Sequence, residues 1–490
     1  MAWVSSSALH VSRRRPMALC VASLFGLAAP LSAVAADTWT VTNCGDGNTG
    51  DIPTKSGTLR FGVANAASGD TVDLSGLINC PSSKISLATG EIVVPQQSLI
   101  IQGPGANVLT IDGTNLPGGS TGSSDSRLFT HKGVGGTLSI YDLSLTAGHV
   151  YHSGFGYPSL GGCIYSASSV TLVRSDVFAC SATQVGGYGA SGGGIYAKGG
   201  VGLKYSTVSG NSASGGISDG GGVRALGQFI AKYSTMSGNH AYGQGYGGGV
   251  FVGGNTTLIG TTISGNISDN NIGGINAFNK VSSGANTFSM TNSTISGNSA
   301  AGVVGGVYSN SGTTKFYYST VAFNTTAAGG VSPGVAISGI YAPVTVTMQS
   351  TLMSNNNYLL GQDNDFSTTS VVSFAAESAN NLVRSTFVVD LPVGSTKFGS
   401  CPLLGPLRDN GGLTKTHALG SRSPAIDVGN NALNKADDQR GSAAENGVLD
   451  YIRRSGPAGE PSPLADIGAY EVQQDEIIFN AEFEGCTPLI

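Results

Sequence analysis

The chain has 490 residues, of which 75 are glycine and only 11% are charged, and its formal net charge is −5. Glycine at this level without a triplet period is not collagen, and a mean hydropathy of +0.09 is not that of a disordered chain. The sequence contains no basic block, which argues against a nucleic-acid partner.

The N-terminus has the pattern of an export leader. Arg13, Arg14 and Arg15 precede an apolar run that extends to Val34, and small residues follow it up to Ala36. This order predicts a signal peptide over residues 1–36, with a membrane anchor as the alternative. Loss of the three arginines would lower the formal net charge from −5 to −8. We therefore expect a secreted or cell-surface protein with no membrane-spanning segment in the mature chain.

Residues 37–115 are predicted to form an N-terminal cap and the first coils of a solenoid. One short helix is expected within residues 58–67, and strand-like runs follow it. A cap is expected because the open strand edges of a solenoid must be covered.

A repeat governs residues 116–400. Its clearest element is a Ser/Thr-Thr pair followed four residues after its second member by asparagine, always with an aliphatic residue or Met three residues before the asparagine. The asparagines are 28, 27, 32, 26 and 31 residues apart, and they are Asn211, Asn239, Asn266, Asn298, Asn324 and Asn355. Paired glycines precede each motif, and short runs rich in Thr, Val, Ile and Tyr alternate in polarity as strands do.

A regular repeat of this length indicates stacked coils that share one core. We therefore predict an all-β fold, a right-handed parallel β-helix with N-terminal and C-terminal caps. The asparagines are expected to form a structural ladder, each side-chain amide donating to the asparagine of the next coil. A ligand-binding polar ladder is the alternative.

Six cysteines follow the leader, and an even number in an exported protein favours disulfides. Proximity suggests three pairs, although sequence alone does not determine connectivity: Cys44–Cys80, Cys163–Cys180 and Cys401–Cys486. Cys180 stands at the asparagine position of the repeat and Cys163 on the glycine turn, which argues against convergence of their side chains. A metal site is the alternative, but no CxxC spacing supports it, and no cofactor or metal is predicted.

Motifs near both ends resemble known bacterial surface proteins. Residues 57–60 and 66–72 resemble the N-terminal module of secreted bacterial right-handed β-helix proteins. Residues 410–419, 423–427, 438–441 and 466–471 resemble the choice-of-anchor Q region of that family, which assigns 401–490 to a C-terminal capping region. The repeats are similar to those of polymorphic outer-membrane proteins. These resemblances imply a secreted or surface β-helix with no settled activity.

Acidic residues are too sparse in the repeats for a carboxylate-based glycosidase. Residues 151–350 contain only Asp176, Asp219 and Asp269, at three different positions of the repeat. No catalytic residue is predicted, although a lyase that uses Tyr, His, Lys or Arg remains open. A second, denser group of acids and arginines near the C-terminus is interpreted as ion pairs in an irregular lid over the last coil, with a metal or catalytic cluster as the alternative.

Aromatic residues gather in the segments that join the asparagine turn to the next glycine pair. Exposed rings of this kind suit stacking on sugars or contact with proteins, and the alternative is that they cover the core. The candidate ligand-binding residues are Tyr151, His152, Tyr157, Tyr188, Tyr242 and Tyr246. We expect an adhesin-like binding protein that contacts glycans or other surface polymers, and we lean against an enzyme. The alternatives are a polysaccharide lyase or glycoside hydrolase with a loop-edge site, and a structural envelope or matrix component.

Overall fold

The computed structural model describes residues 36–117, 124–154, 156–187, 189–278, 286–327, 329–340, 342–358, 362–369, 371–386, 391, 395–446, 450–453 and 464–473. The predicted leader lies outside these residues except for Ala36. No helix among the described residues is long and apolar enough to cross a membrane.

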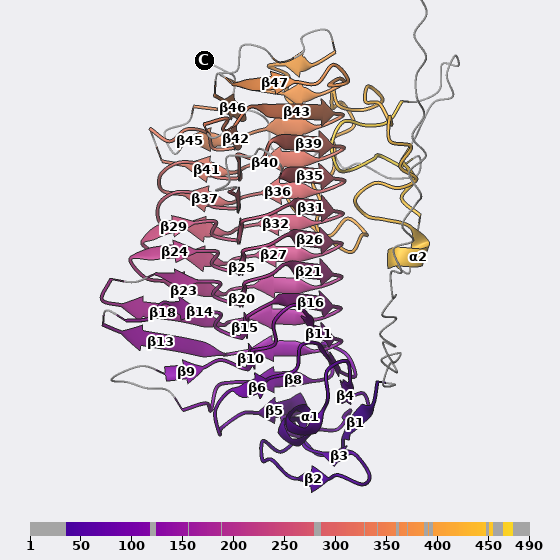
Figure 1. Ribbon diagram of the computed structural model, residues 1–490. Coiled ribbons are helices and arrows are strands. Elements are labelled where there is room, and N and C mark those ends of the chain that lie inside the picture. The colour runs from indigo at the N-terminus through magenta and orange to yellow at the C-terminus, as the bar shows by residue number, and fades with distance from the viewer. Residues whose placement is uncertain are drawn as a thin grey trace, which may run out of the picture. The chain divides into compact units, whose positions relative to one another are not determined.

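The chain winds into stacked coils whose strands form three long sheets (Figure 1). Every pair of named strands is parallel except β2–β3 and β9–β13. The predicted all-β parallel β-helix is therefore confirmed.

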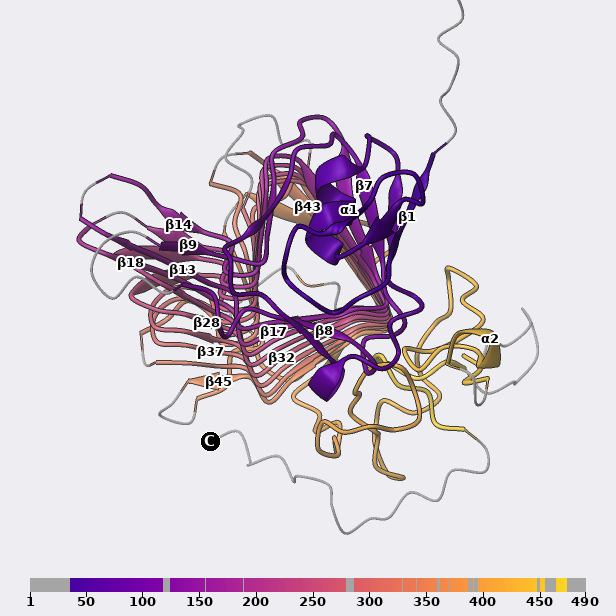
Figure 2. The same ribbon diagram turned by 90° about the horizontal axis from the view of Figure 1, so that it is seen from below.

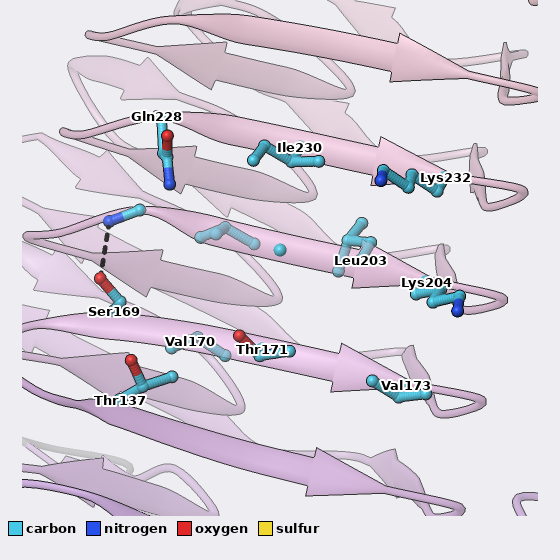
Figure 3. A pocket seen from close by; sticks show the side chains of 13 residues that line it. Thr137, Ser169, Val170, Thr171, Val173, Leu203, Lys204, Gln228, Ile230 and Lys232 are labelled. Atoms are coloured by element: carbon cyan, nitrogen blue, oxygen red, sulfur yellow. Dashed lines mark hydrogen bonds between the residues drawn. The ribbon is translucent and has the colours of Figure 1, made fainter.

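Sheet 1 has fourteen strands: β2 (Gly50–Asp51), β3 (Ser56–Gly57), β1 (Thr38–Val41), β4 (Thr71–Asp73), β7 (Leu99–Gln102), β11 (Thr137–Tyr141), β16 (Ser169–Val173), β21 (Val201–Lys204), β26 (Phe229–Lys232), β31 (Thr256–Ile259), β35 (Thr287–Thr291), β39 (Thr313–Tyr317), β43 (Val344–Gln349) and β47 (Val372–Phe374). Figure 3 shows part of it, with Thr171 and Ile230 on its outward face.

Sheet 2 has twelve strands: β5 (Lys84–Ser86), β8 (Thr110–Asp112), β12 (Ser144–Thr146), β17 (Asp176–Phe178), β22 (Thr207–Ser209), β27 (Thr235–Ser237), β32 (Thr262–Ser264), β36 (Thr294–Ser296), β40 (Thr320–Ala322), β44 (Leu352–Ser354), β48 (Leu382–Val383) and β49 (Lys397–Phe398). Sheet 3 has ten: β6 (Ile92–Val94), β10 (Phe129–His131), β15 (Ile164–Ser166), β20 (Ile195–Ala197), β25 (Val223–Ala225), β30 (Val250–Val252), β34 (Ile275–Ala277), β38 (Val307–Ser309), β42 (Val335–Ile337) and β46 (Phe366–Thr368).

Two further sheets form a fin that projects from the coils between sheets 2 and 3 (Figure 2). The outer fin sheet has nine strands: β9 (Ser124–Ser126), β13 (His149–Ser153), β18 (Ser181–Val185), β23 (Ser212–Ser214), β28 (His240–Ala241), β33 (Ile267–Ser268), β37 (Ser299–Ala300), β41 (Thr325–Thr326) and β45 (Asn357–Tyr358). The inner fin sheet has four: β14 (Ser159–Leu160), β19 (Ala190–Ser191), β24 (Ile217–Asp219) and β29 (Gln244–Tyr246). The segments that join each asparagine turn to the next glycine pair are thus largely strands.

One continuous hydrophobic core fills the solenoid, because alternate residues of each strand point inward. In β16 the inward residues are Val170 and Leu172, which are fully buried, and the residues between them are half-buried. The connected core extends along the chain from Trp39 to Leu391. Stacking supplies the burial that no single coil could provide.

The N-terminal end is closed by α1 (Leu59–Asn65), where the sequence predicts a helix, and by a short 3-10 turn (Pro81–Ser83). Thr58 caps α1 because its hydroxyl accepts a hydrogen bond from the Phe61 backbone N–H. The predicted Cys44–Cys80 disulfide joins two segments of this region, and that pairing is confirmed.

The asparagine ladder runs inside the coils. In each step the side-chain oxygen of one asparagine accepts hydrogen bonds from the backbone N–H and the side-chain amide of the asparagine one coil earlier, as between Asn211 and Asn239 at 3.1 and 3.0 Å. Five predicted positions form it: Asn211, Asn239, Asn266, Asn298 and Asn324. The ladder thus serves structure and faces no ligand, since all five side chains are buried.

The sixth predicted position, Asn355, is corrected by one residue. Asn324 donates to Asn356 at 2.8 Å, and Asn356 in turn donates to Asp365. Strand pairing explains the shift, because Thr320 lies opposite Leu352. Asn355 instead takes the left-handed position, with a φ of 59°, that Gly297 holds two coils earlier with a φ of 65°.

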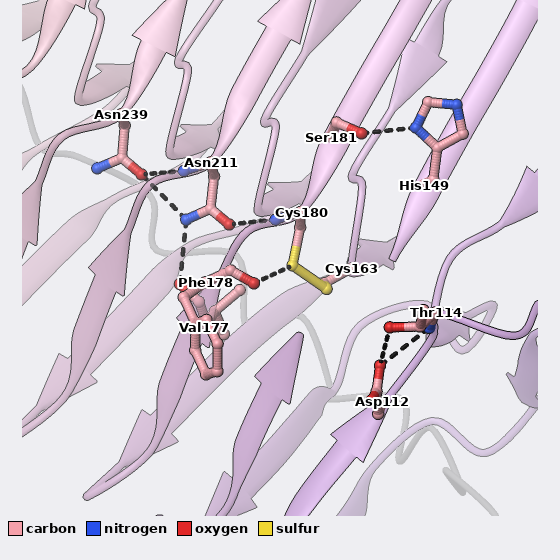
Figure 4. The surroundings of a disulfide bond; sticks show 10 residues. All are labelled: Asp112, Thr114, His149, Cys163, Val177, Phe178, Cys180, Ser181, Asn211 and Asn239. Atoms are coloured by element: carbon pink, nitrogen blue, oxygen red, sulfur yellow. Dashed lines mark hydrogen bonds between the residues drawn. A yellow bond between two sulfur atoms is a disulfide. The ribbon is translucent and has the colours of Figure 1, made fainter. Parts of the chain in front are cut away.

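The second glycine of each pair leaves room for the ladder. A Cβ on Gly194 would lie 3.0 Å from the side-chain carbon of Asn211, and one on Gly222 would lie 2.8 Å from that of Asn239. In the coil before Asn211 the glycine and asparagine positions are taken by Cys163 and Cys180, which form a disulfide (Figure 4). This pairing is confirmed. The side chains of Cys163 and Cys180 were expected not to converge, but they do, because the glycine position and the asparagine position of a coil face each other.

Cys401 is also disulfide-bonded. Its predicted partner, Cys486, lies outside the described residues.

The C-terminal residues, including the short helix α2 (Ala443–Asn446), lie along the outward side of sheet 2, and we call the described part of residues 401–473 the strap (Figures 1 and 2). Sequence reasoning expected a lid over the last coil. The strap lies on the flank instead because outward hydroxyls of successive sheet 2 strands bind it. Thr262 donates to the Lys415 carbonyl at 2.7 Å, Thr294 donates to Gln439 at 2.6 Å, and Thr320 accepts from the Ala469 N–H at 3.0 Å.

Candidate functional site

The predicted ring residues do not form one site. Successive residues of a strand point to opposite faces, so the side chains of Tyr151 and His152 lie on opposite faces of the outer fin sheet. Tyr151 shares the exposed face with Tyr242. Each of these tyrosines stacks on a histidine, Tyr151 on His149 and Tyr242 on His240. They occupy the same column three strands apart, a separation of about 14 Å.

The remaining candidates lie elsewhere. Tyr246 is half-buried and packs against a cluster formed by Ile272, Val304 and Ala336, so this ring contributes to packing between the fin and sheet 3. Tyr188 lies outside the described residues. His152 and Tyr157 are the two candidates that meet, at an open pocket.

This pocket forms where the inner fin sheet begins. The first inner strand, β14, belongs to the coil of β15, and none of the described residues of the preceding coil, which holds β9 and β10, forms a strand of this sheet. The space beside β14 is a cavity of about 400 Å³, which we call the corner pocket. It is lined by Asp125, Arg127, Thr130, His152, Tyr157, Pro158, Leu160 and Tyr165.

A charged network fixes one wall of the corner pocket. Arg127 is buried and pairs with Glu91 and Asp125, at 2.8 Å in both cases. Thr130 donates to the same Glu91 oxygen at 2.6 Å. The Arg127 guanidinium also lies 5.6 Å from the centroid of the Tyr165 ring, within the range of a cation–π contact. The arginine therefore has one orientation, and Asp125, about half exposed, faces solvent.

Hydrogen bonding fixes the tautomer of His152. The Ser159 hydroxyl has one proton, which it donates to the Thr183 carbonyl at 2.6 Å. Ser159 must therefore accept from Nδ1–H of His152, 3.0 Å away. The other ring nitrogen, Nε2, lies 3.4 Å from Asp125 and carries the lone pair when the ring is neutral. The pocket thus presents a histidine nitrogen and a carboxylate side by side.

Above the pocket the outward residues of sheet 3 form a column that the fin covers. Tyr165 stacks on Tyr196 with ring planes 2° apart, and the Arg224 guanidinium lies 3.5 Å from the centroid of Phe251. Arg224 also pairs with Asp219 of the inner fin sheet at 3.0 Å, and burial raises the pKa of Asp219 above its usual value. Tyr196 and Phe251 are buried, so the column becomes accessible at Tyr165, where the inner sheet stops.

Sequence reasoning missed much of this wall. Asp125, Arg127 and Glu91 precede the window in which the acids were counted, and Tyr165 was not among the candidate rings. The Asp-x-Arg spacing at 125–127 was a usable indication, because alternate residues of a strand share a face. The pairing with Glu91 joins adjacent coils, and no local pattern reveals it. Among the described residues, no group of three or more His, Cys, Asp or Glu side chains is placed to hold a metal ion.

Comparisons with known proteins do not show a family for this chain. No family model matches the sequence, so the resemblances to the choice-of-anchor Q region and to polymorphic outer-membrane proteins stay predictions, and no curated protein matches it. Among solved structures the chain is similar to the crystal structure of pectate lyase Pel9A, with 11% sequence identity and a TM-score of 0.40, over 90% of this chain and 98% of that chain. At this level of similarity, function has to be argued from the residues of this chain.

Proposed function

We propose that the protein is a secreted or surface-exposed glycan-binding protein and that the corner pocket binds a neutral sugar unit of a polysaccharide. The observation that carries the proposal is the Tyr157 ring, 75% exposed, at the rim of a cavity whose other walls hold a fixed arginine, one carboxylate and a histidine. An exposed ring offers a flat apolar face to a sugar, and the polar groups supply donors and acceptors to its hydroxyls. The volume lies within the usual range for small-ligand sites.

The charges of the corner pocket favour a neutral sugar over an acidic one. Arg127 is already shared between Glu91 and Asp125, so with a neutral His152 the group carries one net negative charge. A sugar carboxylate placed here would meet like charge without an unpaired cation to offset it. Disulfides and the predicted leader agree with an extracellular location.

Affinity electrophoresis of residues 37–490 through gels containing laminarin, mannan, xyloglucan or a soluble chitin derivative tests the proposal. Retardation by at least one polymer is expected, and Tyr157→Ala and Asp125→Asn should each abolish it while leaving the thermal melt unchanged. Tyr242→Ala is the matched control, since this tyrosine is 41% exposed on the outer fin face, away from the pocket. Absence of retardation in all four gels, or equal losses in all three variants, would overturn the proposal.

The second candidate is a glycoside hydrolase or polysaccharide lyase, and the fixed tautomer of His152 favours it. A histidine lone pair beside a carboxylate in a sugar-sized pocket is a plausible acid–base pair. Incubation with the same four polymers, followed by measurement of new chain ends, distinguishes the two. Release that is lost in His152→Ala would replace the binding proposal by an enzymatic one.

A further inference from the structure

A second hollow lies on the outward face of sheet 1, away from the fin. It has a volume of about 340 Å³ and spans β16, β21 and β26 (Figure 3). Thr171, Gly202 and Ile230 occupy one column on these strands, in register. The hollow forms at Gly202, because the column lacks a side chain there.

The fold does not require glycine at position 202. A Cβ at this position would meet Thr171 at 3.5 Å, an ordinary van der Waals contact. By contrast, a Cβ on Gly193 would approach backbone atoms of the neighbouring coil to 2.2 Å. Glycine inside a strand destabilises it by about 0.5–1 kcal/mol relative to alanine, and it often marks a place where a ligand approaches the backbone closely. The hollow therefore calls for an explanation other than packing.

Two lysines stand at one end of this hollow. Lys204 and Lys232 lie directly opposite each other on β21 and β26, and both are exposed. Like charges in register on neighbouring strands are destabilising. No carboxylate among the described residues lies within 4.0 Å of either ammonium group. In the preceding coil, Arg174 at the same end of the sheet is paired with Asp142 at 2.6 Å.

The opposite end of the hollow is polar and uncharged. Figure 3 shows Thr137, Ser169 and Gln228 there, with Lys204 and Lys232 at the far end. The floor between them consists of the backbone at Gly202 with Ile230 beside it. From one end to the other, the hollow thus offers hydroxyl and amide groups, an apolar floor and two cations.

We propose that this hollow binds a uronic acid unit of a polysaccharide, with its carboxylate at Lys204 and Lys232 and its ring over Gly202. An anion between the lysines would relieve their mutual repulsion, and the hydroxyls of the sugar would face the Ser/Thr/Gln end. This site is separate from the corner pocket and does not depend on the function proposed for it. The protein would then hold a polysaccharide at two places, one selecting a neutral unit and the other an acidic one.

Isothermal titration of residues 37–490 with trigalacturonate tests the site. We expect saturable binding that weakens at least tenfold in Lys204→Ser/Lys232→Ser and at least tenfold in Gly202→Thr, which fills the hollow with a residue suited to a strand. Lys315→Ser is the matched control, because Lys315 faces outward on β39 of the same sheet, three strands from β26. No variant should melt below the parent, which keeps a folding defect distinguishable from a loss of binding.

Two ligand controls define the chemistry. The methyl ester of trigalacturonate should bind at least tenfold more weakly, since it keeps the ring but loses the charge. Inorganic sulfate should compete only at concentrations at least tenfold higher than trigalacturonate. Unchanged affinity in the double-lysine variant, equal binding of the ester, or equal competition by sulfate would each overturn the proposal.

Discussion

The strap and the fin occupy different flanks of one solenoid and use outward polar residues in opposite ways. On the strap side, hydroxyls of sheet 2 are bonded to the protein itself, and Arg440 and Arg453 are fully buried. On the fin side, Asp125 and Tyr157 face solvent at the corner pocket. The difference teaches where function resides, because polar groups whose partners lie within the chain stabilise it, and those open to solvent remain available to a ligand.

The buried cluster of the strap consists of polar groups whose partners lie within the chain. Arg440 pairs with Asp438 at 2.8 Å, and the Tyr451 and Tyr470 rings each lie 4.0 Å from its guanidinium. Arg453 pairs with Glu471 at 3.3 Å. Arg440 and Asp438 are among the acids and arginines that the sequence analysis interpreted as ion pairs, and for this pair the interpretation agrees with the structure.

Arg440→Met should have the largest effect on stability. Removing one partner of a buried ion pair leaves a buried carboxylate without compensation and costs about 3–5 kcal/mol. Limited proteolysis of the strap should accelerate steeply, because cleavage follows the population of the open form. Arg440→Lys should lie between the parent and the methionine variant, since lysine keeps the charge but not the planar stacking between rings. Equal cleavage rates in the parent and the methionine variant would contradict this account.

Gln439→Ala should have the next largest effect. Its side chain accepts from Thr294 at 2.6 Å and donates to Thr262 at 2.8 Å and Thr414 at 2.9 Å, so it joins the strap to two coils. Loss of these bonds should cost about 2 kcal/mol and speed strap cleavage by about 30-fold. Gln228→Ala, at an exposed glutamine directly before β26, serves as the control and should leave the rate unchanged.

The strap should loosen as the pH rises. Burial raises the pKa of Glu471 from 4.5 to about 8, so the folded strap holds this proton more tightly than the unfolded chain does. This contribution to stability is fully present below pH 4.5, decreases as the pH rises, and is lost above about pH 8. Glu471→Gln keeps a neutral side chain at every pH.

Strap cleavage of the parent and of Glu471→Gln, measured side by side from pH 5 to pH 9, checks this expectation. The ratio of the two rates should change across the range, with the parent becoming relatively more susceptible toward pH 9. A ratio that is constant with pH would show that Glu471 does not control the docking.

Tyr157→Ala should have the smallest effect on stability, within about 0.5 kcal/mol, because its ring is 75% exposed. Thermal unfolding by calorimetry measures it. If Tyr157→Ala lowered the free energy of unfolding as much as Gln439→Ala is expected to, the corner pocket would be stabilising the fold as the strap does. The contrast between the two flanks would then be wrong.

The coil architecture was predictable because its determinants are short-range and repeated. Asparagine spacing located the ladder at Asn211 through Asn324, and alternation located the strands. The last rung was not predictable, because two asparagines stand together at 355 and 356 and the choice depends on strand register. Register is set by which residues face the core, which is a property of the whole stack.

The corner pocket and the strap were less predictable, because both join residues far apart in the chain. His152 and Tyr157 were identified as aromatic residues of the joining segments, but they share a pocket with Arg127 because the inner fin sheet begins at β14. Docking of Gln439 on Thr262 spans 177 residues. No local sequence pattern around Gln439 or Thr262 indicates which coil of sheet 2 the strap residue will reach.

The asparagine ladder has a direction, and both of its ends are closed. One N–H of each side-chain amide donates to the asparagine oxygen of the following coil, and the other donates to a backbone carbonyl of the preceding coil, so the asparagine-to-asparagine bonds all run toward the C-terminal end. Asp365 occupies that end and accepts from Asn356, whereas Cys180 at the other end contributes a backbone N–H and no amide side chain. The ladder thus ends at a carboxyl group on its C-terminal side and at a disulfide on its N-terminal side. The solenoid continues beyond both ends of the ladder, with β12, β8 and β5 before the coil of Cys180 and β48 and β49 after the coil of Asn356, so the ladder reinforces the middle coils and the outer coils are held without it.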